Sequence, residues 1–185
     1  PRRWALEGTD LEITNHANVF SRERLDIGTR FLLQNLPRTK EPCEVIDLGC
    51  GNGLLGLMAA RQNPGANLHF VDESYMAIAS ARENFRQIDT GLYRAEFHTS
   101  DGLAGFENGF ADLILCNPPF HQSHAIGDTV ALSMFRQSAG VLRDGGELWV
   151  VGNRHLDYHR KLKRWFKSVE LMASNKKFVI LRAVA

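Results

Sequence analysis

Apolar and polar positions along the chain follow two periods, and the change from one to the other divides the sequence into short strands and amphipathic helices. Five short, mainly apolar runs are predicted to be buried strands: residues 43–48, 68–72, 96–99, 112–116 and 147–151. Segments with apolar residues at helical spacing alternate with these runs: residues 54–62, 76–85, 129–142 and 158–166. Turn-forming residues such as Asn63-Pro64-Gly65 end the helical segments. The pattern therefore predicts alternating strands and helices.

The order of these elements indicates the fold class. Strands that alternate with helices and are apolar throughout are typical of a parallel sheet covered on both faces. The last two apolar runs, 169–172 and 177–181, are joined by a short turn, so they must pair antiparallel. We therefore expect an α/β fold with a doubly wound, mostly parallel seven-stranded sheet and one antiparallel strand near the edge.

Length and composition limit the possible classes of protein. With 185 residues, of which 44% are apolar and 23% charged, the chain has the composition of one globular domain. We expect a lead-in segment over residues 1–35, packed on a domain that spans residues 36–185. No apolar run approaches the roughly 20 residues that cross a bilayer, so no membrane partner is expected. Three cysteines without a CxxC pair argue against disulfides and a zinc site, so we expect a cytoplasmic protein without a metal. The sequence leaves the oligomeric state open, with a monomer favoured.

Charge is unevenly distributed along the chain. The 22 basic and 21 acidic residues give a net charge of +1, which excludes a basic coat over the whole protein. Residues 151–185 nevertheless hold nine basic and two acidic residues, against 13 and 19 in the rest of the chain. This segment is either a surface for nucleic-acid phosphates or the solvated side of an amphipathic helix.

A glycine-rich segment, Asp47-Leu48-Gly49-Cys50-Gly51-Asn52-Gly53, lies where the first buried strand meets a helix. Glycines there allow a tight turn on which a ligand can lie, and Asp72, 23 residues after Gly49, ends the next strand, where an acidic residue binds ribose hydroxyls. The Asp47 carboxylate would repel a pyrophosphate but attract an ammonium group. The pattern therefore favours S-adenosylmethionine over a dinucleotide, with a tight structural turn as the alternative.

The cofactor site predicted from the strand ends contains residues from four loops. Asp101 follows the third strand and can accept a hydrogen bond from an adenine amino group, although Asp-Gly is also a common turn. The predicted cofactor-binding residues are Asp47, Gly49, Gly51, Gly53, Asp72, Asp101 and Asn117.

The tetrapeptide Asn117-Pro118-Pro119-Phe120 directly follows the fourth strand and is the predicted catalytic segment. The Asn117 side-chain oxygen and the Pro118 carbonyl could accept the two N–H bonds of one planar NH₂ group, and Phe120 could stack on a base. Such an amine is a poor nucleophile, because its lone pair is delocalised. Holding both N–H bonds would direct the lone pair at the methyl group, so positioning would supply much of the catalysis. The alternative is an ordinary loop that ends a strand.

Together these segments resemble the class I S-adenosylmethionine-dependent amino-methyltransferases. The longer string Asn117–His121, with Val19-Phe20-Ser21 and Leu25-Asp26 upstream, resembles the bacterial ribosomal RNA guanine-N2-methyltransferases, above all those of the large subunit. In that family a glycine often stands where this chain has Ser123. The resemblance implies methyl transfer to the N2 amine of a guanine in ribosomal RNA, with 23S RNA favoured.

The same resemblance implies a role for each matching residue. Asn117 and Pro118 would hold the target amine, and Phe120 would stack on the guanine. An N-terminal domain of similar fold, outside this chain, would aid RNA recognition.

Other interpretations of the same residues stay open. An Asn-Pro-Pro-Tyr/Phe segment also serves adenine N6 and protein glutamine amides, and a non-catalytic RNA-binding domain is a third possibility. His121 and His124 could contact the substrate or could be ordinary loop residues, since no further metal ligand lies near them in the sequence. Cys50 and Cys116 flank the predicted site, where small apolar packing is favoured over a nucleophilic role.

Overall fold

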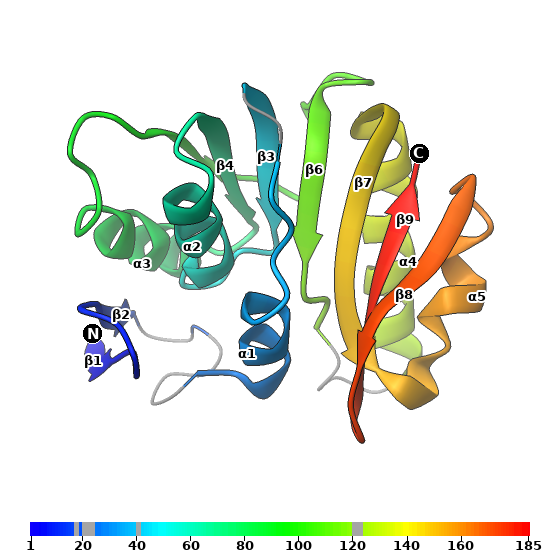
Figure 1. Ribbon diagram of the computed structural model, residues 1–185, viewed down its shortest axis with the longest axis horizontal. Coiled ribbons are helices and arrows are strands. Elements are labelled where there is room, and N and C mark those ends of the chain that lie inside the picture. The colour runs from blue at the N-terminus through cyan, green and yellow to red at the C-terminus, as the bar shows by residue number, and fades with distance from the viewer. Residues whose placement is uncertain (17–18, 20–24, 40–41, 120–123) are drawn as a thin grey trace.

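The computed structural model describes residues 1–16, 19, 25–39, 42–119 and 124–185, and a seven-stranded sheet forms its centre (Figure 1). The strand order is β5-β4-β3-β6-β7-β9-β8. The strands are β3 (Cys43–Leu48), β4 (Ala66–Asp72), β5 (Arg94–Thr99), β6 (Ala111–Cys116), β7 (Leu142–Asn153), β8 (Ser168–Ser174) and β9 (Phe178–Val184). Six of these strands include one of the predicted runs, and β9 begins one residue after the start of the run predicted at residues 177–181.

Strand directions confirm the predicted fold class. The five strands from β5 to β7 pair in parallel, and β9 is antiparallel to both of its neighbours, β7 and β8. The sheet is therefore doubly wound and mostly parallel, with its one antiparallel strand next to the edge. Strand β7 begins five residues before the predicted run, because its pairing with β6 shifts register between Ala111 and Leu113.

Helices cover both faces of the sheet. They are α1 (Ile27–Leu33), α2 (Leu54–Gln62), α3 (Tyr75–Phe85), α4 (His124–Val141) and α5 (Tyr158–Leu162), with a short 3-10 helix at Arg154–Leu156. Two predicted boundaries are wrong: α4 begins at residue 124 instead of 129, and α5 ends at residue 162 instead of 166. No helix in the described ranges has the combination of length and apolarity that crossing a membrane requires.

Alternate residues of the central strands β3 and β6 pack into different apolar clusters. Val45 and Leu113 lie in the cluster that includes Leu57 of α2, whereas Ile46 and Ile114 pack with Phe135 of α4. All six side chains are buried. Because side chains alternate across a strand, near-continuous apolar runs supply both clusters at once.

The described part of the first 35 residues contains a hairpin and a helix. Strands β1 (Arg2–Ala5) and β2 (Glu12–Asn15) pair antiparallel. The buried Asn84 of α3 accepts a hydrogen bond from the Thr14 N–H at 2.7 Å and donates to the Thr14 carbonyl at 2.9 Å. Leu32 of α1 is fully buried and belongs to the same apolar cluster as Leu57. The hairpin is therefore attached to α3, and α1 packs into the apolar cluster on the face of the sheet that α2 covers.

Candidate active site

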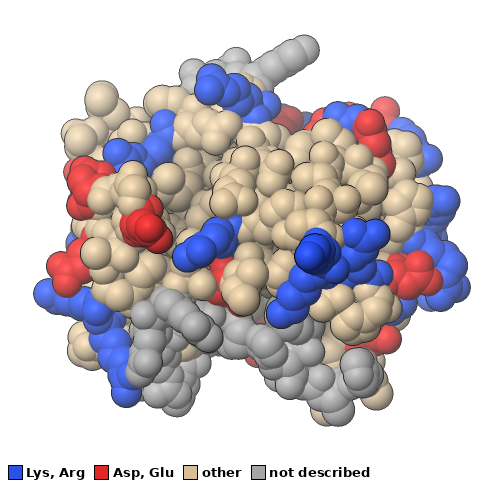
Figure 2. All heavy atoms as spheres, turned by 60° about the horizontal axis from the view of Figure 1, so that its bottom comes forward, with Lys and Arg blue, Asp and Glu red and all other residues tan. Residues whose placement is uncertain are grey.

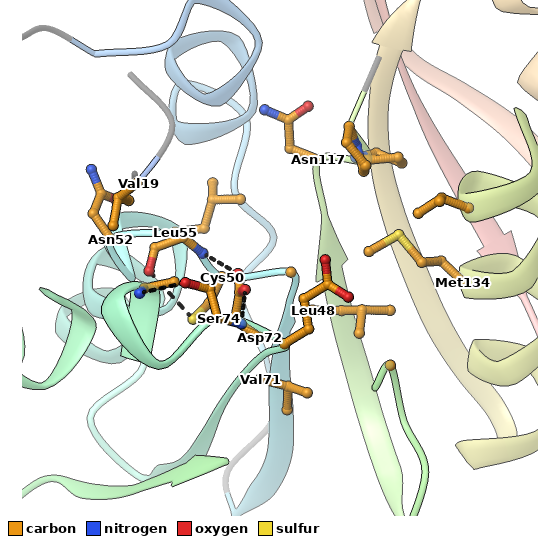
Figure 3. Close-up of a pocket in the computed structure, with 18 of the residues that line it drawn as sticks. Val19, Leu48, Cys50, Asn52, Leu55, Val71, Asp72, Ser74, Asn117 and Met134 are labelled. Atoms are coloured by element: carbon orange, nitrogen blue, oxygen red, sulfur yellow. Dashed lines mark hydrogen bonds between the residues drawn. The ribbon is translucent and has the colours of Figure 1, made fainter. Parts of the chain in front are cut away.

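A cavity of about 700 Å³ lies at the carboxyl ends of β3, β4 and β6 (Figure 3). Its walls come from α1, from the loops after β3, β4, β5 and β6, and from α4. Ligands of open α/β sheets bind where successive connections leave in opposite directions, and β3 lies between β4 and β6 at such a point. The volume is in the range of small-molecule sites.

The glycine loop forms one wall of this cavity. Gly49 and Gly51 line it, and both have positive φ angles, of 65° and 53°. The Gly51 N–H donates to the Asp72 carboxylate at 3.0 Å, and the Cys50 N–H donates to the Val71 carbonyl at 2.9 Å. These bonds attach the loop to the end of β4.

Asp72 and Asp101 line the same cavity. The second oxygen of Asp72 accepts the Ser74 N–H at 2.9 Å, and Ser74 caps the N-terminus of α3. The loop that carries Asp101 is held by α4, because the Leu103 N–H donates to the side-chain oxygen of Gln137 at 3.0 Å. The structure thus brings both predicted carboxylates to one cavity.

Asp47 and Gly53 lie behind the loop and not among the residues that line the cavity. Asp47 is 1% exposed, and its Oδ2 accepts the Gly56 N–H at 2.8 Å. Its Oδ1 is buried without a hydrogen-bond partner among the described residues. Burial, with a smaller effect of the Asp72 charge, raises the pKa of Asp47 to about 8. The structure therefore places this predicted cofactor-binding residue behind the loop, where its side chain does not line the cavity.

Gly53 is required by packing. Its φ is +80°, and a Cβ built there would lie 2.7 Å from the Ala81 Cβ and 2.9 Å from the Ala81 Cα. No side chain fits between α2 and α3 at this point, so the glycine allows the two helices to approach each other.

Asn117 forms the opposite wall, together with Pro118 and Pro119. Its Nδ2 donates to Asp26 Oδ2 at 2.9 Å and to Thr29 Oγ1 at 3.0 Å. Both N–H bonds of the amide thus have acceptors on α1 or at its N-cap. No described residue donates to Asn117 Oδ1, so this oxygen is the free acceptor of the amide.

Asp26 holds two groups with one oxygen. Its Oδ2 caps α1 by accepting the Thr29 N–H at 2.9 Å, and it also accepts from Asn117. The sequence shows a helix start at Asp26, but the contact with Asn117 spans 91 positions and has no local signal. Met134 and Gln137 of α4, which also line the cavity, were missed for the same reason.

Two cysteines near the cavity are buried, and burial raises the pKa of the Cys50 thiol and of the Cys116 thiol. Protonated thiols are weak nucleophiles, which agrees with the packing role favoured from the sequence. The predicted roles of Phe120 and His121, like the upstream Phe20 and Ser21, lie outside the described residues.

Comparisons with known proteins agree with this geometry. The chain is 53% identical over 184 residues to the ribosomal RNA large subunit methyltransferase G of Pseudoalteromonas translucida, which covers 99% of this chain and 48% of the relative. It is 57% identical over 183 residues to the protein of the same name from Pseudomonas aeruginosa, which covers 99% of this chain and 49% of the relative. The chain thus spans about half the length of these curated relatives.

A solved structure has the same architecture. It is a 16S ribosomal RNA N2 guanine methyltransferase of T. thermophilus in complex with AdoMet and guanosine. Its TM-score is 0.83 at 26% identity, and the match covers 98% of this chain and 49% of that one. Residues 10–182 match the family described as the methyltransferase small domain. On this match, the chain belongs to the methyltransferase small domain family.

Proposed function

We propose that this chain transfers a methyl group from S-adenosylmethionine to the exocyclic N2 amine of a guanine in ribosomal RNA, with 23S RNA as the substrate. The observation that carries the proposal is the Asn117 amide, whose two N–H bonds are engaged by Asp26 and Thr29. Its oxygen is the free acceptor of the amide, and Asn117 lines the same cavity as the glycine loop. A planar NH₂ group is the donor that such an acceptor fits.

The wall around the glycine loop fits S-adenosylmethionine. The backbone of Gly49 and Gly51 would hold the amino-acid end, while Asp72 and Asp101 would hold the ribose and the adenine. The Asp47 carboxyl group lies behind the loop with an Oδ1 that accepts no hydrogen bond from the described residues, and a cationic ligand in the cavity would favour its ionised form. When bound, S-adenosylmethionine supplies a methyl group made electrophilic by a positively charged sulfur.

Asn117 and Pro118 would orient the target amine. Accepting its N–H bonds favours a tetrahedral nitrogen and turns the lone pair toward the methyl-donor side of the cavity. The fixed φ of the two prolines keeps the Pro118 carbonyl rigid, and prolines offer no N–H that would compete for this acceptor. The chain therefore contributes chiefly positioning, and the proton can leave to solvent after transfer.

Asp26 and Thr29 are positioning residues in this proposal. If the Asn117 amide were rotated by half a turn, its NH₂ group would face the target amine, and two donors would meet. The charged Asp26 acceptor disfavours that rotation, because hydrogen bonds to ionised groups are the stronger ones. In this proposal, α1 and its N-cap residue fix which end of the Asn117 amide faces the target amine.

RNA as the partner is supported by charge as well as by the names of the relatives. Figure 2 shows Lys and Arg side chains gathered at the right-hand side of its view, where Figure 1 places α5 and β8. Residues 151–185, which form these elements, hold nine basic and two acidic residues. Phosphate contacts from this surface would hold the RNA while the target guanine is flipped into the cavity.

The curated relatives are about twice as long as this chain. We propose that a further domain, N-terminal to this chain, contributes to RNA recognition. We also propose that the protein acts in the bacterial cytoplasm, where ribosomal RNA is modified.

The test is transfer of tritiated methyl groups to unmethylated 23S and 16S RNA, followed by digestion to nucleosides. We expect label in N2-methylguanosine from 23S RNA, and its loss in the Asn117→Ala variant. Label in N6-methyladenosine, or on protein glutamine in a parallel assay, would overturn the proposal in favour of the other amines. Binding of S-adenosylmethionine without transfer to RNA or protein would favour a non-catalytic role. Repeating the assay on ribosomal particles separates naked RNA from assembled subunits as substrate.

A further inference from the structure

A second cluster of chemically active side chains lies in the sheet, outside the cavity. His69 of β4 is paired in register with Glu96 of β5, and His98 lies two residues further along β5 on the same face. None of the three lines the candidate active site. Their three ligand-type atoms come together because of the β4–β5 register, which no local sequence pattern shows.

The three atoms form a nearly equilateral triangle. His69 Nδ1 is 3.4 Å from His98 Nε2 and 3.2 Å from Glu96 Oε2, and His98 Nε2 is 3.4 Å from Glu96 Oε2. A tetrahedral zinc ion with bonds of about 2.0–2.1 Å holds its ligand atoms about 3.3–3.4 Å apart. The triangle therefore has the dimensions of one face of a zinc coordination shell.

A carboxylate behind the cluster fixes the ring of His69. Glu44 Oε2 lies 2.7 Å from His69 Nε2, and the other oxygen of Glu44 accepts from Asn67 Nδ2 at 3.0 Å. Glu44 favours the tautomer of His69 that carries its proton on Nε2, and in that tautomer the lone pair on Nδ1 faces the other two groups. Histidine ligands of metals almost always have such a carboxylate or carbonyl partner on the second nitrogen.

The surroundings of the cluster are dry on one side and open on the other. The Phe106 and Phe110 rings make T-shaped contacts with the His69 ring, with ring centroids 6.0 and 5.0 Å away. The His69 side chain is 8% exposed, whereas that of Glu96 is 66% exposed. A metal ion would therefore have protein on three sides and a fourth position that water can reach.

We propose that His69, Glu96 and His98 bind one divalent transition-metal ion, with zinc as the metal that the two imidazoles, one carboxylate and tetrahedral spacing select. The ion would attach the edge strand β5 to β4, and β5 leads directly into the loop that carries Asp101. This proposal revises the prediction of no metal site. That prediction rested on cysteine spacing and on His121 and His124, whose side chains the structure does not describe.

The test is calorimetric titration of zinc chloride into the untagged, metal-free 185-residue chain, with cobalt absorption as a measure of geometry. We expect one equivalent of zinc per chain, tetrahedral cobalt bands, and a higher thermal midpoint with zinc. His98→Asn and Glu96→Gln should abolish saturable binding. Glu44→Gln, which touches no metal, should weaken it by about 10–100-fold.

Matched controls keep the result specific. His16 lies 3.0 Å from Glu83 without a third ligand in the described part of the chain, so His16→Gln should leave zinc binding unchanged. Glu96 is largely exposed, so Glu96→Gln should not disturb packing, and circular dichroism of this variant checks that the fold is retained. Absence of saturable binding, binding that persists in both His98→Asn and Glu96→Gln, or binding lost only when His121 and His124 are replaced would overturn the proposal.

Discussion

The two walls of the cavity are built in different ways. On the glycine-loop wall, Gly51 bonds to Asp72 and Cys50 to Val71, so short stretches of consecutive elements hold each other. On the opposite wall, Asn117 is held by Asp26 and Thr29, which lie 91 and 88 positions earlier in the chain. The first wall is specified by a local strand-turn-helix motif, and the second by the packing of α1 against the sheet.

This difference separates binding from orientation. The glycine-loop wall presents backbone and carboxylate groups with which a cofactor can be held. The Asn117 wall presents one amide, whose usefulness depends on which of its two ends faces the cavity. Substitutions on the first wall should therefore alter cofactor affinity or stability, and those on the second should alter turnover.

The largest expected effect is that of Asn117→Ala. Removing the acceptor should lower kcat by roughly 10²–10³-fold, the loss typical of one preorganised polar group in an active site. Cofactor affinity, measured by calorimetry with S-adenosylhomocysteine, should change little. Unchanged turnover would remove Asn117 from the mechanism. It would also contradict the division into a cofactor-binding wall and a wall that orients the target amine.

Gly53→Ala tests the packing behind the glycine loop. An alanine there would have an unfavourable φ and would overlap Ala81, so the free energy of unfolding should fall. Gly91→Ala is the matched control, because its φ of +81° is nearly the same but no atom lies within 4 Å of the added Cβ. Chemical denaturation should show Gly53→Ala less stable than the control by about 1–3 kcal/mol. Equal losses would show that only the backbone conformation matters.

Asp26→Ser tests the orientation of the amide. Serine caps helices about as well as aspartate, so stability should be nearly retained, but it lacks the charged acceptor for Asn117. We expect kcat to fall about tenfold, which corresponds to one charge-assisted hydrogen bond. KM for S-adenosylmethionine should stay the same. Asp26→Asn keeps a side-chain oxygen at the same reach but also lacks the charge, so kcat should fall in it by a similar or smaller factor, and unchanged kcat in both variants would contradict the orienting role.

Asp47→Asn tests the buried carboxyl group through pH. The pKa of Asp47 rises from its ordinary 3.8 to about 8 in the folded chain, so the folded state holds the proton more tightly than the unfolded state. Its contribution to stability is therefore full below pH 4 and is lost as the pH rises toward 8. Between pH 5 and 8, the wild type should lose stability relative to the variant by less than about 1.4 kcal/mol per pH unit, the limit for one proton. Parallel pH profiles in urea denaturation would show that Asp47 does not titrate in this range.

The sequence predicts the fold and the glycine-loop wall because their signals are local. Apolar runs identify the strands of the sheet, and a strand-turn-helix junction identifies the loop at Gly49. The early start of α4 was missed because Ile126 is 54% exposed, so the apolar period does not begin there. Element boundaries are predicted where buried apolar residues recur with a regular period, and they are missed where the first turn of a helix is exposed.

Contacts between distant segments account for what was missed. The partner of Asn117 is set by how α1 packs, and the pairing of His69 with Glu96 is set by strand register. Neither depends on residue spacing within one element. Such pairs become visible only when the sheet is assembled, although the candidate catalytic segment itself can be picked out from its residues.

The most direct measurement is a crystal structure of this chain with S-adenosylhomocysteine and guanosine. We predict that the guanine N2 lies within hydrogen-bond distance of the Asn117 side-chain oxygen, with Asp26 and Thr29 still bound to its nitrogen. The cofactor should lie along Gly49–Gly51. A guanine whose N2 points away from Asn117, or a cofactor bound elsewhere than at the glycine loop, would contradict the account.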